Sequence, residues 1–482
     1  MRNAQRSLNE GLSCATPLPR CRQGACSSEA RCSGGLKCLD DLTYRGAVTL
    51  VEPVQPAKAP TGARHTTDVT AVDLTMPRSF AEAVPHADFD ALRGAGGIAW
   101  HDEQPVDPNL HRGFIRFVDS PGFWAVTSHS LTNEVLRDQR RFSSELGTTV
   151  LQTLAPESLS ILRSMMLNLD PPQHTRLRRI LQPSFSPRAI DGMREAIQLN
   201  AREIIDEIGD AETCELVSSV SAELPLRVLA DLLGMPYEDR HLIFEWSNAL
   251  IESDAADDSE GADAGVDAMS AAIAYGQQMA LDRRADPKDD IVSLIANAEI
   301  DGDRLSDTEF SMFWVLLIVA GNETTRNALS GSVIALLEHD RWGWLTEHPE
   351  HMSTAVEELL RYVSPVMHFR RTATEDTVLG DQSIRAGDKV VVWYGAANRD
   401  PAVFSDPHEI DLLRRPNSHL AFGTGPHFCL GAHLARLELA TMLGQLLKRA
   451  PRMELDGDPK RVVSNFINGI SSLPVRLGPQ AL

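Results

Sequence analysis

One cysteine in the C-terminal part of the chain lies in a loop whose residue types suit a metal or a flat cofactor. Cys429 belongs to the segment Phe422-Gly423-Thr424-Gly425-Pro426-His427-Phe428-Cys429-Leu430-Gly431, in which three of ten residues are glycine. Glycine permits sharp turns and a close approach of the backbone to a ligand. Leucines at helical spacing follow the loop, so Cys429 should stand at a helix N-terminus, where unpaired N–H groups favour a thiolate that can ligate a metal. A lone cysteine is more commonly a small buried apolar side chain, and Cys429 taken by itself also allows that interpretation.

A long apolar helix is predicted from residue 306 to about residue 340, with polar residues in its middle. Ser306 and Glu309 form an S-x-x-E capping box, and residues 310–320 are apolar almost all round, which indicates a buried helix. The segment Gly321-Asn322-Glu323-Thr324 then breaks several local rules together, because glycine weakens a helix by about 1 kcal/mol and a buried acid needs a partner. We expect a break here, which is either functional or a kink whose threonine hydroxyls bond the preceding turn.

The cysteine loop follows the pattern F-G-x-G-x-H-x-C-x-G and closely resembles the haem-binding signature of the cytochromes P450. The resemblance implies haem b (iron protoporphyrin IX) as cofactor, with Cys429 as the thiolate ligand of its iron and with Phe422, Gly423 and His427 as further haem contacts. A thiolate on haem iron pushes electron density toward the metal and favours cleavage of dioxygen. The resemblance also makes Glu323 and Thr324 the family's acid–alcohol pair, which delivers protons in catalysis.

Charged residues elsewhere match positions that hold the fold and the haem in this family. Glu358 and Arg361 are three apart in a helix that Pro365 ends, and alone they would be an ordinary surface pair. The resemblance implies that they form a structural cluster with Arg414, for which the adjacent Arg415 is the rival. Buried propionates need paired donors. The donors that the resemblance implies are His174, Arg178, Arg371 (with Arg370 as rival) and His427.

The remaining pattern predicts a mainly α fold, and the resemblance implies the cytochrome P450 fold, a helix-rich domain with small antiparallel β-sheets. Amphipathic helix dominates residues 188–250, a short strand is expected at 122–127 and a small sheet at 378–393. Residues 1–75 lack periodicity and are predicted to be a disordered N-terminal extension, with the haem-thiolate monooxygenase domain at 76–482. Residues 252–267 hold seven acids and no base, which is typical of a solvated, mobile connection.

Composition and charge exclude some classes of protein. The chain has 482 residues, and its 46 Lys and Arg against 67 Asp and Glu give a net charge of −21. So acidic a chain lacks the basic footprint of broad nucleic-acid binding. No stretch approaches the roughly 20 apolar residues of a membrane span and the N-terminus has no apolar signal region, so we expect a cytoplasmic protein. Five of the seven cysteines fall in the first 40 residues without a C-x-x-C pair, which disfavours a structural zinc site.

These features predict a haem-thiolate monooxygenase that inserts one oxygen atom of O2 into an unactivated C–H bond of a hydrophobic substrate. The segments AGNETTRN, RRTATED and ANRDP resemble actinobacterial members that act on sterol side chains, branched fatty acids and isoprenoids. An alternative is tailoring hydroxylation of a polyketide or terpene in secondary metabolism. A peroxide-using haem-thiolate enzyme and a non-catalytic haem-binding module are alternatives of other classes, and the polar segment in the long helix argues against both. Candidate pocket residues, which could instead be core packing, are Val319, Ala320, Val366, Met367 and His368.

The sequence shows no fused flavin domain, and the resemblance implies that an iron–sulfur ferredoxin and its reductase supply electrons to a monomeric enzyme. A basic patch on the haem-proximal elements could steer an acidic ferredoxin. The same side chains could equally be solvated helix faces. They are Arg176, Arg178, Arg179, Arg188, Arg436 and Lys448.

Overall fold

The computed structural model describes residues 60–106, 111–112, 115–255, 259–300 and 302–478. The disorder predicted for residues 1–59 lies outside these ranges. Residues 60–75, which the sequence placed in the extension, belong to the folded domain. Leu74 is fully buried, its carbonyl accepts a hydrogen bond of 3.0 Å from the side chain of Asn465, and the carbonyl of Arg64 accepts one of 2.7 Å from the backbone of Trp100. The predicted domain start at residue 76 is therefore too late.

The largest sheet has five strands in the order β1 (Ile98–Asp102), β4 (Gly122–Val126), β12 (Lys389–Trp393), β9 (His368–Ala373) and β5 (Phe142–Ser143). The pairing of β12 with β4 is parallel and the other pairings are antiparallel. Every residue of β4 and β12 is buried, as expected for interior strands covered on both faces. The strand predicted at residues 122–127 is confirmed. The small antiparallel sheet predicted at 378–393 is confirmed for β10 (Thr377–Leu379) and β11 (Gln382–Ile384) only, because β12 belongs to the five-stranded sheet.

The other strands form small sheets of two or three. They are β2 (His111–Arg112), β3 (Ile115–Arg116), β6 (Thr213–Glu215), β7 (Glu299–Ile300), β8 (Asp303–Arg304), β10 (Thr377–Leu379), β11 (Gln382–Ile384), β13 (Glu454–Leu455), β14 (Lys460–Arg461), β15 (Ile470–Ser472) and β16 (Pro474–Arg476).

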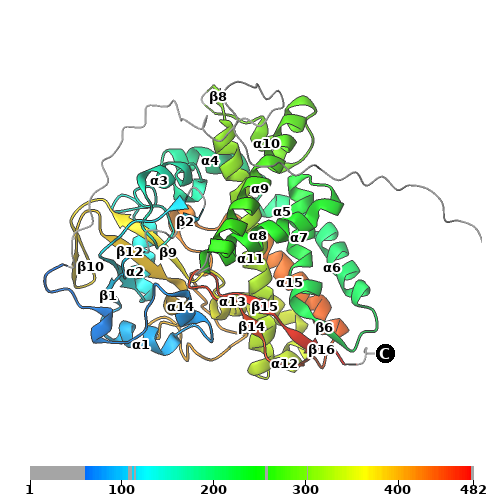
Figure 1. The fold of residues 1–482 in the computed structure, drawn as a ribbon. Helices are drawn as coiled ribbons and strands as arrows, with labels where there is room; N and C mark the ends of the chain where they lie inside the picture. Colours follow the sequence, from blue (N-terminus) through cyan, green and yellow to red (C-terminus); the bar gives the residue numbers. More distant parts are fainter. Residues whose placement is uncertain (1–59, 107–110, 113–114, 256–258, 301, 479–482) are drawn as a thin grey trace, which may run out of the picture. The chain divides into compact units, whose positions relative to one another are not determined.

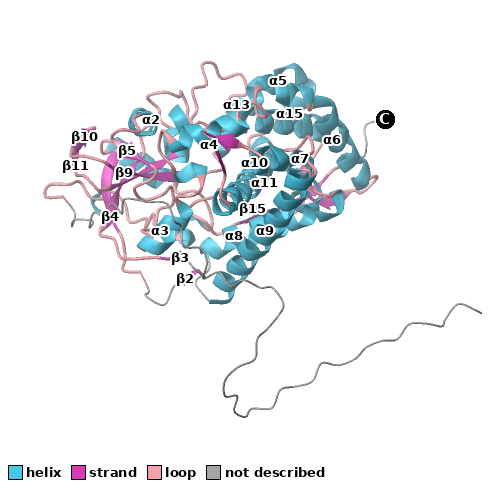
Figure 2. Cartoon of the chain, turned by 90° about the horizontal axis from the view of Figure 1, so that it is seen from above, coloured by secondary structure: helices cyan, strands magenta, loops and turns pink. Residues whose placement is uncertain are grey.

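Helices make up most of the rest, which confirms the predicted fold class. The α-helices are α1 (His86–Gly94), α2 (His129–Arg137), α3 (Pro156–Leu162), α4 (Gln173–Leu181), α5 (Pro187–Gly192), α6 (Arg194–Ile208), α7 (Glu223–Leu233), α8 (Arg240–Ala255), α9 (Ser259–Ala285), α10 (Ile291–Ala296), α11 (Asp307–Glu338), α12 (Trp342–Glu347), α13 (Met352–Val363), α14 (Tyr394–Ala397) and α15 (Ala432–Arg449). The strands of the large sheet gather on one side of these helices, and α5, α6, α7 and α15 lie on the other (Figure 1 and Figure 2). No helix in the described part of the chain combines the length and apolar character needed to cross a bilayer.

Helix α11 joins two hydrophobic cores. Its C-terminal half packs with α6, α13 and α15, and its N-terminal half packs with α7, α8, α9 and α10. The Ser306–Glu309 capping box is present at its start. The predicted break does not interrupt the helix, because α11 is helical from Asp307 to Glu338. The alternative interpretation expected a threonine hydroxyl to bond the preceding turn, and Thr324 donates such a bond to the carbonyl of Ala320. Gly321 serves packing instead, since a Cβ there would come within 3.2 Å of Leu229 on α7.

The acidic stretch at residues 252–267 is also mostly helical, so the predicted mobile connection is wrong for the described part of it. Helix α8 continues to Ala255 and α9 begins at Ser259; residues 256–258 lie outside the described ranges. Alanine has the best intrinsic helix propensity and recurs through the stretch.

Candidate active site

The loop before α15 turns sharply around Cys429. The backbone N–H of Cys429 donates a hydrogen bond of 2.9 Å to the carbonyl of Phe422, which closes the loop. Gly423 and Gly425 have φ values of 67° and 71°, a region that favours glycine. A Cβ on Gly425 would also lie 2.6 Å from the carbonyl oxygen of Leu136, so this turn excludes every other residue.

Cys429 stands two residues before Gly431, the N-cap of α15, as the sequence predicted. Burial raises the pKa of the Cys429 thiol above its usual range, while the backbone N–H of Gly431 and the charges of Arg178 and Arg436 act in the opposite direction. The polypeptide alone therefore favours the thiol, and a coordinated metal cation would supply what is needed to ionise it.

A group of four donors, two of them buried and two half-buried, lies beside this loop. His174 and Arg178 come from α4, Arg371 from β9, and His427 from the cysteine loop itself. The rings of His174 and His427 are 4.1 Å apart at their centroids. Arg178 donates a hydrogen bond of 2.7 Å to the carbonyl of Phe428. The rival residue Arg370 points elsewhere, to the carbonyl of Gln152 at 3.0 Å.

The electrostatics of this group suit an anionic ligand. Burial and the nearby arginines lower the pKa of His174 to about 4 and that of His427 well below its usual value. The side chain of Arg371 is almost fully buried, and among the described residues its guanidinium bonds the carbonyl of Arg370 at 2.8 Å but no carboxylate. Nδ1 of His174 is buried without a hydrogen-bond partner. A dianionic group such as the two propionates of haem would satisfy these donors.

The described residues contain no group of three or more His, Cys, Asp or Glu side chains that could together hold a metal ion. A single cysteine in a glycine-rich loop, with cations to one side, is enough to ligate a haem. The donor set therefore fits haem.

Glu323, the predicted acid of the proton relay, is bonded to several neighbouring side chains. Glu323 is 1% exposed and forms an ion pair of 2.5 Å with Arg326, one turn along α11. Asn327 bonds the same carboxylate at 3.3 Å, and Ser247 on α8 bonds it at 3.4 Å. Glu323 is thus the centre of a buried polar cluster that links α11 to α8.

Thr324 lies on a more open part of the same turn. Its side chain is half-buried, and its hydroxyl donates a hydrogen bond of 2.8 Å to the carbonyl of Ala320. Ala320 is exposed and Val319 is half-buried. This face of α11 therefore presents small side chains and a hydroxyl to open space.

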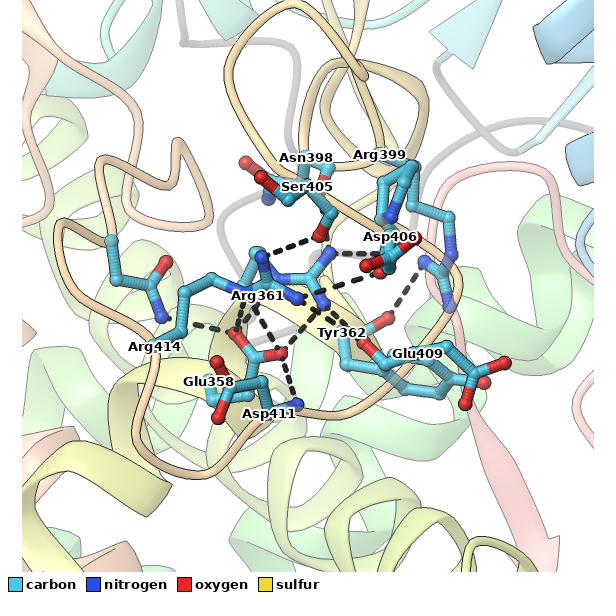
Figure 3. Close-up of polar contacts among 12 residues, drawn as sticks. Glu358, Arg361, Tyr362, Asn398, Arg399, Ser405, Asp406, Glu409, Asp411 and Arg414 are labelled. Atoms are coloured by element: carbon cyan, nitrogen blue, oxygen red, sulfur yellow. Dashed lines mark hydrogen bonds and ion pairs between the residues drawn. The ribbon is translucent and has the colours of Figure 1, made fainter.

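The predicted charge cluster is present around Glu358 on α13 (Figure 3). Arg361 forms a bidentate pair with Glu358 at 2.7 and 2.8 Å. Nε of Arg414 contacts both carboxylate oxygens at 3.0 and 3.1 Å, whereas the rival Arg415 is exposed. Arg361 also bonds carbonyls of the loop at Asn398, Pro407 and Glu409, so the cluster fixes the long segment that precedes the cysteine loop.

The pocket residues predicted at and just before the start of β9 are mostly buried. Met367 and His368 are each 2% exposed. His368 lies against Trp393 with ring centroids 4.8 Å apart and bonds the carbonyl of Asn465. Both side chains pack in the core of the protein, while Val366 stays half-buried.

Sequence reasoning missed several residues of the site. Ser144 contacts Nε2 of His427 at 3.3 Å, and Tyr394 lies within 3.7 Å of the position that a Cβ on Gly423 would take. No local motif marks these residues, because they come from distant segments. Arg326 and Asn327 could have been found, since they stand three and four residues after Glu323 on one helix.

Comparisons with known proteins agree with this geometry. A family model described as Cytochrome P450 matches residues 349–469. Steroid C26-monooxygenase from Rhodococcus jostii (strain RHA1) is 38% identical over 411 residues, covering 84% of this chain and 84% of that protein. Linalool 8-monooxygenase from Pseudomonas putida is 35% identical over 416 residues, covering 85% of this chain and 99% of that protein. A solved Mycobacterium marinum cytochrome P450 in complex with pseudoionone has a TM-score of 0.77 and 37% identity, covering 84% of this chain and 98% of that one.

Proposed function

Since the chain belongs to the cytochrome P450 family, we propose that it hydroxylates an unactivated C–H bond of a sterol or isoprenoid substrate with electrons from a ferredoxin. The enzyme is a monooxygenase and its cofactor is haem. When bound, the haem supplies the iron centre at which dioxygen is activated for insertion of one oxygen atom into the substrate. The residues of the chain bind the haem, cover it and transfer protons beside it.

The observation that carries the proposal is that Cys429 lies beside a group of four donors, of which His174 and Arg371 are buried, with no bonded carboxylate among the described residues. We infer that Cys429 ligates the iron. Arg371 and Arg178 neutralise the propionates, and His174 and His427 donate hydrogen bonds to them. Phe422 and Gly423 bring the backbone of the loop against the haem.

Thr324 is the proposed proton-handling group. Its hydroxyl donates a hydrogen bond to the carbonyl of Ala320, which leaves the hydroxyl oxygen able to accept a hydrogen bond. To hand its own proton on, the hydroxyl must rotate away from Ala320 and then take a new proton from a neighbour. Glu323 acts through the cluster with Arg326, and it can exchange a proton with Thr324 only when that ion pair opens.

The proposed substrate class rests on the open face of α11 and on the relatives. Small side chains at Val319 and Ala320 leave room for a bulky apolar molecule. The similar curated proteins are named for a steroid and for linalool, and the similar solved structure holds pseudoionone. Each of these names a mostly hydrocarbon molecule.

The proposed ferredoxin surface is smaller than the sequence suggested. Arg178 donates to the carbonyl of Phe428 and Arg436 pairs with Glu357, so neither side chain is available for docking. Arg179, Arg188 and Lys448 are exposed. Charge reversal at Arg179 should slow reduction by ferredoxin in a salt-sensitive way. Reduction rates that do not change with salt concentration would contradict a docking role for this surface.

A spectral binding screen with sterols, fatty acids and terpenes tests the substrate class, because displacement of the axial water shifts the Soret band. Product analysis with ferredoxin and reductase, compared with peroxide alone, tests the reaction. We expect sterols or isoprenoids to give the largest shift and oxygenated product only with the electron-transfer proteins. Tight binding of fatty acids alone would overturn the substrate class, and full turnover with peroxide alone would overturn the ferredoxin route.

A further inference from the structure

One carboxylate on α13 holds the cysteine loop from both ends. Glu357 receives two hydrogen bonds from Arg436 on α15, of 2.5 Å from Nε and 2.8 Å from Nη2. It receives a third from Nε2 of His419, of 3.1 Å. His419 precedes the loop and Arg436 follows it, so Glu357 is a common anchor for the two segments that enter and leave it.

His419 links Glu357 to the backbone at the start of the loop. Its Nδ1 accepts a hydrogen bond of 3.2 Å from the backbone N–H of Ala421. An acceptor at Nδ1 places the ring proton on Nε2, which is the nitrogen that faces Glu357. The His419 side chain is only 3% exposed, so it has one stable orientation.

Arg436 links Glu357 to Phe422, the aromatic residue whose carbonyl closes the loop. Its guanidinium lies 4.4 Å from the centroid of the Phe422 ring, a favourable cation–π distance. The carbonyl of Phe422 accepts the hydrogen bond of Cys429. Guanidinium, aromatic ring and cysteine backbone therefore form one connected unit, and the charge of Arg436 acts on the Cys429 sulfur.

The anchor is a charged pair rather than a neutral contact. Burial alone would raise the pKa of Glu357, but the hydrogen bonds from Arg436 and His419 outweigh it and hold this pKa at about 2. The side chains of Glu357 and Arg436 are 31% and 29% exposed, so water screens their mutual attraction in part. An anion and a cation thus stand side by side behind the cysteine loop.

We propose that Glu357 and Arg436 are positioning residues whose opposite charges set the reduction potential of the cysteine-ligated haem. Reduction adds an electron to the cofactor, so a nearby cation favours it and a nearby anion opposes it. In the intact pair each charge offsets part of the effect of the other, and loss of either partner leaves the remaining charge uncompensated. The inference rests on the proposed role of Cys429 as the iron ligand.

The test is the midpoint potential of the haem-loaded enzyme, measured by spectroelectrochemical titration. Glu357→Gln leaves Arg436 uncompensated and should raise the potential. Arg436→Gln leaves Glu357 uncompensated and should lower it. The double variant should return close to the wild-type value, and Arg436→Lys, which keeps the charge, should shift the potential less than Arg436→Gln.

Opposite signs are the decisive result, because a loop that merely loosens would move both single variants in the same direction. Shifts of the same sign, or none, would overturn the inference. Asp456→Asn, which breaks the ion pair with Arg476 in the C-terminal sheet, is the matched control and should leave the potential unchanged. The ferrous–carbonyl spectrum of the wild type separates the two proposals, since absence of a thiolate-type Soret band would remove the Cys429 assignment itself.

Discussion

Glu323 and Arg326 stand one turn apart on α11 and form an ion pair in which both side chains are at most 5% exposed. Asn248 on α8 bonds Arg326 at 2.7 Å, and Asn327 bonds the backbone of Ile470 at 3.0 Å. This polar cluster therefore connects α11 to α8 on one side and to β15 on the other. Its charges are tolerated in the interior only because each has a partner.

Arg326→Leu should destabilise the folded enzyme by roughly 3–5 kcal/mol, because it leaves the buried Glu323 carboxylate unpaired. The double variant Glu323→Gln/Arg326→Leu should be more stable than this single variant. Denaturant unfolding of the haem-loaded protein measures both. Arg304→Leu, which breaks an exposed pair with Glu299, should change stability by about 0.5 kcal/mol or less. Equal losses in Arg326→Leu and the double variant would contradict the buried-charge argument.

Thr324→Ala should leave haem binding intact but slow product formation by roughly 10²-fold, the lower range for loss of a proton-transfer group. NAD(P)H oxidation should continue and be diverted to hydrogen peroxide. Product, NAD(P)H and peroxide are measured in the same turnover experiment. Thr324→Ser, which keeps the hydroxyl, should retain most of the coupling, and so should Thr325→Val at the adjacent buried threonine. An unchanged product yield per NAD(P)H in Thr324→Ala would remove its proposed role.

The sequence was most informative where chemistry is concentrated in a short segment. The cysteine loop, the capping box of α11 and the Glu358–Arg361 spacing are local patterns, and the structure contains all of them. The continuous course of α11 was not predictable, because the fit of Gly321 against Leu229 and the partners of Glu323 on α8 are tertiary contacts. The contacts of Glu357 with His419 and Arg436 were not predictable for the same reason, since these partners lie 62 and 79 residues away along the chain.

Two neighbouring arginines should respond very differently to the same substitution. Arg414→Gln removes a partner of the fully buried Glu358, and we expect a loss of about 3 kcal/mol or more together with poor haem retention. Arg415→Gln alters an exposed side chain and should stay within about 0.5 kcal/mol of the wild type. Unfolding midpoints and the haem content of the purified variants decide between them. Similar stability of the two variants would show that Arg414 does not support the cluster.

Two helical glycines offer another matched pair. A Cβ on Gly276 of α9 would lie 2.6 Å from the ring of Trp314 on α11, whereas a Cβ on Gly444 of α15 would meet nothing within 4 Å. Gly276→Ala should therefore lower stability by about 1–3 kcal/mol through overpacking. Gly444→Ala should raise it by about 0.5–1 kcal/mol, because alanine is the better helix former. Thermal unfolding of the two variants measures both effects, and a stabilised Gly276→Ala would contradict the close approach of α9 and α11.

Acid should destabilise the enzyme in part through His368. Burial lowers the pKa of His368 to about 4 in the folded state, against about 6.5 for an unperturbed histidine. Above pH 6.5 neither state binds the proton and the contribution of His368 to stability is complete. Between pH 6.5 and pH 4, His368 becomes protonated in the unfolded chain but stays neutral in the folded chain. The free energy of unfolding therefore falls with decreasing pH by up to about 1.4 kcal/mol per pH unit.

His368→Asn removes this titration while keeping a donor for the carbonyl of Asn465, which Nδ1 of His368 bonds at 2.9 Å. The free energy of unfolding of this variant should therefore fall less steeply than that of the wild type between pH 6.5 and pH 4. His348→Asn replaces a histidine whose side chain is 43% exposed and should follow the wild-type curve. Denaturant unfolding at a series of pH values gives the slopes directly. Parallel curves for His368→Asn and the wild type would mean that His368 accepts its proton in the folded state as readily as in the unfolded chain.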